Sequence, residues 1–145
     1  MNYTITTAPC GIDCFNCLLF VDMQQSNERK AFNERHPQMS GLNCQGCRQQ
    51  NCPMLSGPCK TRQCVEDREI EFCHECADFP CALLAPVADQ AGKFPHNMKV
   101  YNLCRIKSVG VDQWAREEAT TIRTRYFTGT FQIGVGQEGE ATTKE

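Results

Sequence analysis

Eight cysteines lie within 38 residues in the middle of the chain, between Cys44 and Cys81. Three more lie near the N-terminus, and the twelfth, Cys104, stands alone further along. The central stretch is broken by prolines and glycines and has little helical or strand periodicity, which predicts loops. Loops that lack a core need cross-links to fix their shape, and thiolates provide these by binding a metal ion. The cysteine density therefore constrains the fold more than any other feature of the sequence.

The cysteines are predicted to be metal ligands rather than disulfides. The N-terminal residues MNYTITTAPCGIDC lack the basic start and apolar run of a secretory signal. No stretch of the sequence approaches the roughly twenty apolar residues that span a bilayer. A cytoplasmic location follows as the expectation, and thiols stay reduced there.

Three C-x-x-C pairs begin at Cys14, Cys44 and Cys73. A tight turn brings the two sulfurs of such a pair within reach of one ion, and two pairs complete a tetrahedral site. The first two pairs are therefore predicted to share an ion. The candidate metal ligands are all the clustered cysteines: Cys10, Cys14, Cys17, Cys44, Cys47, Cys52, Cys59, Cys64, Cys73, Cys76 and Cys81.

The spacing leaves open how these eleven thiols are divided between ions, because two sites of four leave three over. In the first site, Cys10 is an alternative to Cys14. In the second site, Cys52 is an alternative to Cys59. A third site or bridging thiolates would use all eleven. The second site is predicted to draw its four ligands from Cys59, Cys64, Cys73, Cys76 and Cys81.

Zinc is the predicted cofactor, held in closed Cys₄ sites with a structural role. Soft thiolates also accept iron, so an iron–sulfur cluster with a redox or sensing role is the alternative. Cys10, Cys14 and Cys17 have the C-x₃-C-x₂-C spacing of radical SAM enzymes, but the chain is too short for the large α/β barrel of those enzymes. Redox C-x-x-C pairs lie at a helix start after a strand, and none of the three pairs does. No catalytic residue is predicted, and the chain is not expected to be an enzyme.

The predicted fold is mainly α: a small metal-stabilised domain over residues 1–125, with a flexible tail at 126–145. Its parts are an N-terminal helix, a loop-rich cysteine centre with zinc-knuckle-like turns, and two C-terminal helices. The N-terminal helix is expected over residues 18–36, because Pro37 ends it, and a strand or extended segment is expected before Cys10. Within the centre, one helical turn is expected at residues 65–70 and a short helix at FPCALL, capped by Asp78.

The first C-terminal helix is expected over residues 95–108, because Pro95 suits a first turn. Asp112 is expected to cap the second helix, in which Trp114 and other apolar residues recur at helical spacing. A short strand is compatible with residues 130–135. The core candidates of the first helix are Val100, Leu103, Cys104 and Ile106.

The formal net charge is −2, and the segment from Lys93 to Arg125 carries seven basic and three acidic residues. Such a local excess is typical of a solvated helical face, so nucleic acid is not the expected partner. The expected partner is another protein, and no membrane association is expected. His74 is not needed as a ligand, because the adjacent cysteines suffice. The other histidines, His36 and His96, and the carboxylates of Asp13 and Glu75 are expected to be solvated.

The ordered series CGIDCFNC, CQGC, CKTRQC and EFCHECADFPCALL, followed by FPHNMKVYNLCRIKSVGVDQW, resembles the domain of unknown function 3795 family of bacteria and archaea. The resemblance covers residues 8–118. It implies a cysteine-rich, zinc-binding protein and brings no activity with it. The spacing between Cys47 and Cys59 varies in that family, so Cys52 receives no family position. The resemblance assigns family positions to Cys10, Cys14, Cys17, Cys44, Cys47, Cys59, Cys64, Cys73, Cys76 and Cys81.

Overall fold

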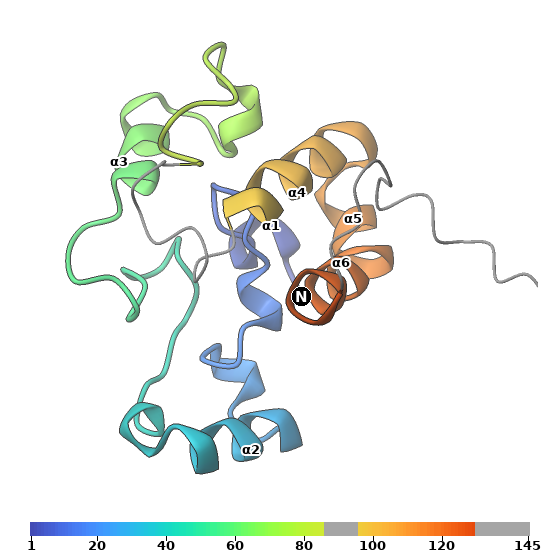
Figure 1. The fold of residues 1–145 in the computed structure, drawn as a ribbon. Helices are drawn as coiled ribbons and strands as arrows, with labels where there is room; N and C mark the ends of the chain where they lie inside the picture. The colour runs from blue at the N-terminus through green and yellow to red at the C-terminus, as the bar shows by residue number, and fades with distance from the viewer. Residues whose placement is uncertain (86–95, 130–145) are drawn as a thin grey trace, which may run out of the picture.

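A computed structural model describes residues 1–85 and 96–129 of the chain (Figure 1). Over these residues the fold is helical, and its β-structure is limited to an isolated parallel bridge between Phe20 and Cys44. The prediction of a small, mainly helical, cysteine-rich domain is confirmed. The helices are α1 (Tyr3–Thr6), α2 (Asn27–Arg35), α3 (Lys60–Asp67), α4 (His96–Val109), α5 (Val111–Glu117) and α6 (Ala119–Thr128), and the 3₁₀ turns are η1 (Cys14–Asn16), η2 (Val21–Met23), η3 (Pro37–Met39) and η4 (Cys73–Glu75).

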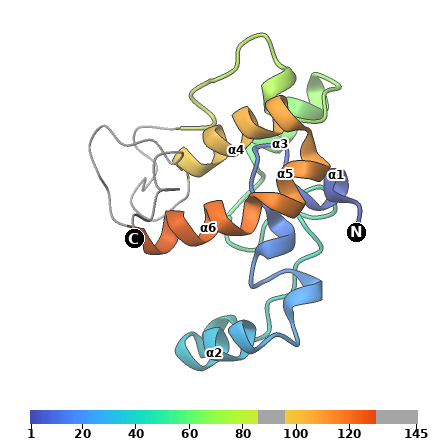
Figure 2. The same cartoon turned by 90° about the vertical axis from the view of Figure 1, so that its right-hand side faces the viewer.

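The core lies where the N-terminal residues meet the C-terminal helices. Helices α4, α5 and α6 pack on one another, and α1 packs on α5 (Figures 1 and 2). Trp114 of α5 is fully buried, and its ring centroid lies 6.0 Å from that of Phe15, which lies 5.1 Å from that of Tyr3. The first cysteine turn is therefore built directly onto the helical core, because Phe15 is its central residue.

The N-terminal helix begins nine residues later than predicted, at Asn27 instead of Leu18. Ser26 caps it, since its Oγ accepts a hydrogen bond from the backbone N–H of Arg29 at 3.0 Å. The apolar residues before Ser26 serve tertiary packing instead of helix formation: Leu19 and Phe20 are buried. Figure 2 shows α2 set apart from α4–α6. Helix α2 belongs to the loop of the chain between Cys17 and Cys44.

The buried guanidinium of Arg29 holds this loop together. It donates hydrogen bonds to the carbonyl oxygens of Met39, Ser40 and Leu42, at 3.1, 3.2 and 2.8 Å. These bonds fold the chain after α2 back toward the cysteine centre. The position of Cys44 thus depends on a polar contact within the loop.

Several other predicted elements differ from the structure. Residues 3–6 form a short helix capped by Asn2, where a strand or extended segment was expected. Helix α3 begins at Lys60, earlier than the predicted turn, and FPCALL forms no helix up to residue 85. The second C-terminal helix is divided into α5 and α6 at Glu118, and Gly110 takes the cap position predicted for Asp112. Residues 130–135 lie outside the described residues.

Two residues of α4 were placed wrongly from the sequence: Cys104, expected in the core, and His96, expected at the surface. Leu103 and Ile106 are buried, as predicted, but Cys104 is exposed. It follows Leu103 directly, so it lies about 100° further round the helix and points away from the core. His96, expected at the surface, is buried, and its Nδ1 lies 3.1 Å from Nζ of Lys99. Across the described residues, no helix combines the length and apolar character needed to cross a membrane.

Candidate metal centre

Two of the three C-x-x-C pairs adopt the same turn. Cys14 and Cys73 each begin a 3₁₀ turn, and the backbone N–H of the second cysteine donates to the carbonyl oxygen of the first, at 2.9 and 3.2 Å. The second cysteines, Cys17 and Cys76, also share one backbone conformation, with φ/ψ of −74°/133° and −73°/138°. A repeated turn at repeated C-x-x-C spacing presents pairs of sulfurs in the same way at both places.

Backbone pairing brings the first two C-x-x-C pairs together. The N–H of Cys44 donates to the carbonyl oxygen of Leu19 at 2.9 Å, and the N–H of Val21 donates to that of Cys44 at 2.8 Å. The sulfurs of Cys14 and Cys47 then lie 3.6 Å apart. The edge of a tetrahedral ZnS₄ site with typical Zn–S bonds is about 3.8 Å. The predicted proximity of these two pairs is thus observed for one sulfur from each.

Cys52 joins the same region, and the sulfurs there compete for protons. Hydrogen bonding to Cys47 lowers the pKa of Cys14, and it lowers the pKa of Cys52 to about 6. The same contacts raise the pKa of Cys47, so Cys47 retains the proton longest. Burial raises the pKa of Cys17 and of Cys44, and the charges of Cys14 and Cys52 add to both shifts. These five cysteines are called the first thiol group: Cys14, Cys17, Cys44, Cys47 and Cys52.

A second thiol group surrounds Cys73. Burial raises the pKa of Cys73 to about 12, and the charges of nearby cysteines add to the rise. Cys64 comes from α3, and Cys76 from the end of η4. The second thiol group is therefore Cys64, Cys73, Cys76 and Cys81.

Two further candidate ligands, Cys10 and Cys59, belong to neither thiol group. The backbone N–H of Cys73 donates to the carbonyl oxygen of Pro9 at 3.0 Å, which places Cys10 beside the second group. Burial raises the pKa of Cys10 to about 11, and the charges of Cys14 and Cys59 add to the rise. Cys59 is the residue that precedes α3.

All twelve cysteines fall within the described residues, and each is a free thiol. Within the described ranges, no three or more Cys, His, Asp or Glu side chains are placed so that they could hold a metal ion together. The sulfurs of Cys14 and Cys47 form a close pair. His74 stacks on the ring of Phe72, with 5.7 Å between ring centroids.

Backbone N–H groups donate to sulfur at two of the candidate ligands, one in each thiol group. In both cases the donor is the residue two positions further along: the sulfur of Cys44 accepts from Gly46 at 3.3 Å, and that of Cys76 accepts from Asp78 at 3.4 Å. A sulfur that accepts N–H bonds is stabilised as a thiolate, the form that binds metal. At four more candidate ligands a backbone N–H acts to lower the pKa of the thiol: Ile12 at Cys10, Cys47 at Cys14, Leu19 at Cys17 and Met54 at Cys52.

One arginine lies at the second thiol group, and another lies between the two groups. In the second group, Arg68 donates to the sulfur of Cys76 at 2.8 Å and pairs with Asp78 at 2.9 Å. Between the groups, Arg48 donates to the carbonyl oxygens of Thr7 and Glu71, at 2.9 and 2.7 Å. The Arg48 guanidinium also lies 4.8 Å from the ring centroid of Phe72, next to Cys73. Arg48 thus links the N-terminal segment to the segment that carries the second group.

Replacing Arg48 by Lys is expected to lower the free energy of unfolding by about 2 kcal/mol, because an ammonium group cannot donate to two carbonyls and stack on a ring at once. Urea denaturation of the purified protein measures the change. Arg62→Lys is the matched control: Arg62 forms an exposed pair with Glu66 one helical turn away, so its loss is expected to stay below about 0.5 kcal/mol. Equal losses in the two variants would contradict the bridging role of Arg48.

Asp13 is the residue of the first motif that the sequence analysis placed wrongly. It is not solvated but 0% exposed, and its carboxylate pairs with Arg123 of α6 at 3.0 Å. Burial raises the pKa of Asp13, and the charge of Arg123 opposes that rise. The residue lies 110 positions from its partner, so no local pattern could have indicated the pair. The position of Asp13 between the candidate ligands Cys10 and Cys14 was the one signal in the sequence that it belongs to the site.

The family model for Protein of unknown function (DUF3795) matches residues 6–86. The match contains all eleven candidate ligands and ends before α4, so the closing helical segment included in the sequence resemblance lies outside it. No curated protein and no solved structure is similar enough to match. This chain is cysteine-rich, with twelve cysteines. Because the family model covers more than half of the chain, the chain belongs to the DUF3795 family, whose function is unknown.

Proposed function

We propose that this protein binds zinc through thiolates, with one ion at each thiol group, and that the ions fix the loop-rich cysteine centre in shape. The observation that carries the proposal is the pair of backbone N–H···S hydrogen bonds at Cys44 and Cys76, one in each thiol group. Each bond favours the deprotonated sulfur. A hydrophobic core gains nothing from a thiol prepared in this way, whereas a metal ion binds the thiolate.

The local charges support the same function. Thiolates brought together without a cation repel one another, so an arrangement that collects them needs positive charge. Arg68 supplies one charge at Cys76, and Arg48 supplies a second between the groups. Two arginines do not neutralise eight or more thiolates. A divalent ion at the first group would take the place of protons on thiols such as Cys14 and Cys47, whose sulfurs lie 3.6 Å apart.

A structural role fits the way the groups are anchored. The first group is attached to the core through Phe15, and the second through the buried side chains of Val65 and Phe72. The segments between these anchors are loops with few buried apolar residues. Zinc would supply the cross-links there: four of Cys14, Cys17, Cys44, Cys47 and Cys52 would hold the first ion, and Cys64, Cys73, Cys76 and Cys81 the second.

Metal analysis of protein purified under reducing, oxygen-free conditions tests the proposal. The expected result is a colourless protein with two zinc ions per chain and no acid-labile sulfide. Replacement by Co²⁺ should give the absorption of tetrahedral cobalt–thiolate sites at both ions. A brown protein that contains iron and sulfide would show that the cofactor is an iron–sulfur cluster and not zinc. Protein that retains neither metal, with all twelve thiols free to react with a thiol reagent, would refute metal binding altogether.

A further inference from the structure

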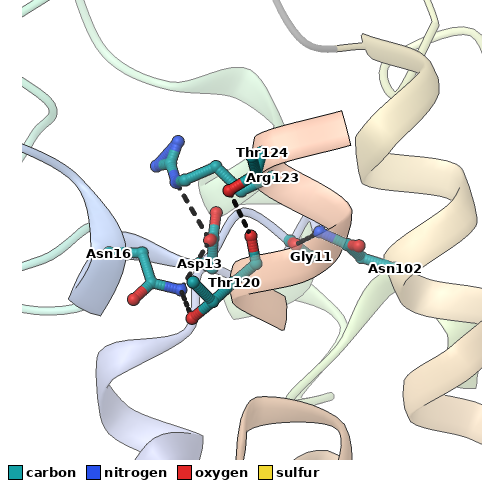
Figure 3. Close-up of polar contacts among 7 residues, drawn as sticks. All are labelled: Gly11, Asp13, Asn16, Asn102, Thr120, Arg123 and Thr124. Carbon is teal, nitrogen blue, oxygen red and sulfur yellow. Dashed lines mark hydrogen bonds and ion pairs between the residues drawn. The ribbon is translucent and has the colours of Figure 1, made fainter. Parts of the chain in front are cut away.

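A buried polar cluster attaches the first cysteine turn, at Cys14–Cys17, to the C-terminal helices (Figure 3). Asp13, which directly precedes Cys14, accepts hydrogen bonds at Oδ2 from Arg123 and from the Asn16 side-chain amide, both at 3.0 Å. The amide of Asn16 also reaches the hydroxyl of Thr120 on α6, at 3.4 Å. One helix of the C-terminal region thus contacts the turn through two side chains.

Helix α4 contacts the same turn from another direction. Asn102, which is 1% exposed, donates from its side-chain amide to the carbonyl oxygen of Gly11 at 2.7 Å. Gly11 and Asp13 lie on either side of Ile12, so the backbone between Cys10 and Cys14 is fixed by one helix at each end. Both helices lie outside the residues that match the family model.

We infer that Asp13 and Arg123 are positioning residues of the first thiol group: through their ion pair, helix α6 holds the Cys14–Cys17 turn in the geometry that binds the metal ion. This inference rests on the proposed metal binding. The contact is specific to the first group, because the cysteines of the second group lie in segments that Asp13 and Arg123 do not contact within the described residues.

The geometry explains why the pair acts on metal affinity and not on the core alone. Asp13 is adjacent to a candidate ligand, and Asn16, the other donor to its carboxylate, is adjacent to Cys17. A displaced carboxylate would therefore move both ligands of the turn. Loss of an outer-shell partner typically weakens metal binding by about 10–100-fold.

Cobalt titration of the reduced apo-protein in competition with a chelator tests the inference. The variants Cys47→Ser and Cys76→Ser first assign the two binding signals to the two thiol groups, because each variant removes one sulfur from a different group. Asp13→Asn is then expected to weaken binding of the first ion about 10–100-fold and to change binding of the second by no more than about twofold. A purely structural role would weaken both ions alike, since binding of each is coupled to folding.

Glu118→Gln is the matched control. It removes the ion pair between Glu118 and Arg105, which joins the same helices at 2.8 Å without touching a cysteine turn, so both ions should bind as in the wild type. If Asp13→Asn does not fold, the double variant Asp13→Asn/Arg123→Met removes both charges together and should show the same selective loss. Equal weakening of both ions, or no weakening, overturns the inference. A wild-type protein that binds no cobalt overturns the proposed function itself.

Discussion

Replacing Cys47 by Ser is expected to reduce the zinc content from two ions to one and to unfold the loops around the first thiol group. Cys47 is the sulfur that contacts both Cys14 and Cys52, so its loss removes the centre of the group. Structural zinc in small peptides contributes on the order of 10–16 kcal/mol, whereas a whole domain is stable by about 5–15 kcal/mol. Loss of the first ion is therefore large enough to unfold the loops that it cross-links, while the second group, attached to the core through Val65 and Phe72, keeps its ion.

Zinc content, circular dichroism and urea denaturation measure this effect together. Cys104→Ser provides the matched control, since Cys104 is an exposed thiol on α4 that belongs to neither group. That variant is expected to keep both ions and its unfolding midpoint. Adding a strong zinc chelator to the wild type should reproduce the Cys47→Ser spectrum and then go further, because it removes both ions. A folded Cys47→Ser protein that still holds two ions would exclude Cys47 as a ligand.

The spacing of the cysteines predicts local turns more readily than it predicts how the cysteines are grouped. The 3₁₀ turns at Cys14 and Cys73 are closed by hydrogen bonds within the motif, whereas Cys44 pairs with Leu19 and Val21 and begins no such turn. The contact between Cys52 and Cys47 does not follow from local sequence, because the five-residue step between them is set by the surrounding loop. The spacing allows Cys52 as an alternative ligand in the second site, whereas in the structure Cys52 lies with the first thiol group. Which sulfurs share an ion stays a prediction.

Helix boundaries were predicted wrongly where tertiary contacts override the local preference for helix. Residues 18–23 are apolar enough to begin a helix, but the backbone of Leu19 and Val21 pairs with Cys44 instead. A serine seven positions after Leu19 then provides the cap that begins α2. The C-terminal helices were easier to predict, because Leu103, Ile106 and Trp114 recur at a spacing that buries one face.

Buried polar contacts were the least predictable part of the candidate site. Asp13, Arg48 and Asn102 are ordinary polar residues in the sequence, and each finds its partner more than twenty residues away. Burial of such a group is favourable only when it is paired, as Oδ2 of Asp13 is with Arg123 and Asn16. That condition depends on the assembled fold, so it is invisible to a local pattern. These contacts are nevertheless what attach the cysteine turns to the helices.

Replacing Gly11 by Ala is expected to destabilise the protein by about 3–5 kcal/mol, from backbone strain and overpacking together. Gly11 has a φ of +84°, a conformation that favours glycine. An added Cβ would also lie 2.8 Å from the carbonyl oxygen of Lys99 and 2.9 Å from Cγ of Leu103. The first is backbone of α4 and the second is a buried core side chain, so neither can move easily.

Gly110→Ala separates the two contributions, because Gly110 has nearly the same φ, +83°, and an added Cβ there meets nothing within 4 Å. Its loss should be strain alone, about 1–3 kcal/mol. Urea denaturation of the zinc-loaded variants measures both losses. A larger loss for Gly11→Ala means that α4 lies against the cysteine turn so closely that only a glycine fits. Equal losses would mean that α4 can move away from the turn, and then the hydrogen bond from Asn102 to Gly11 could not hold the two together.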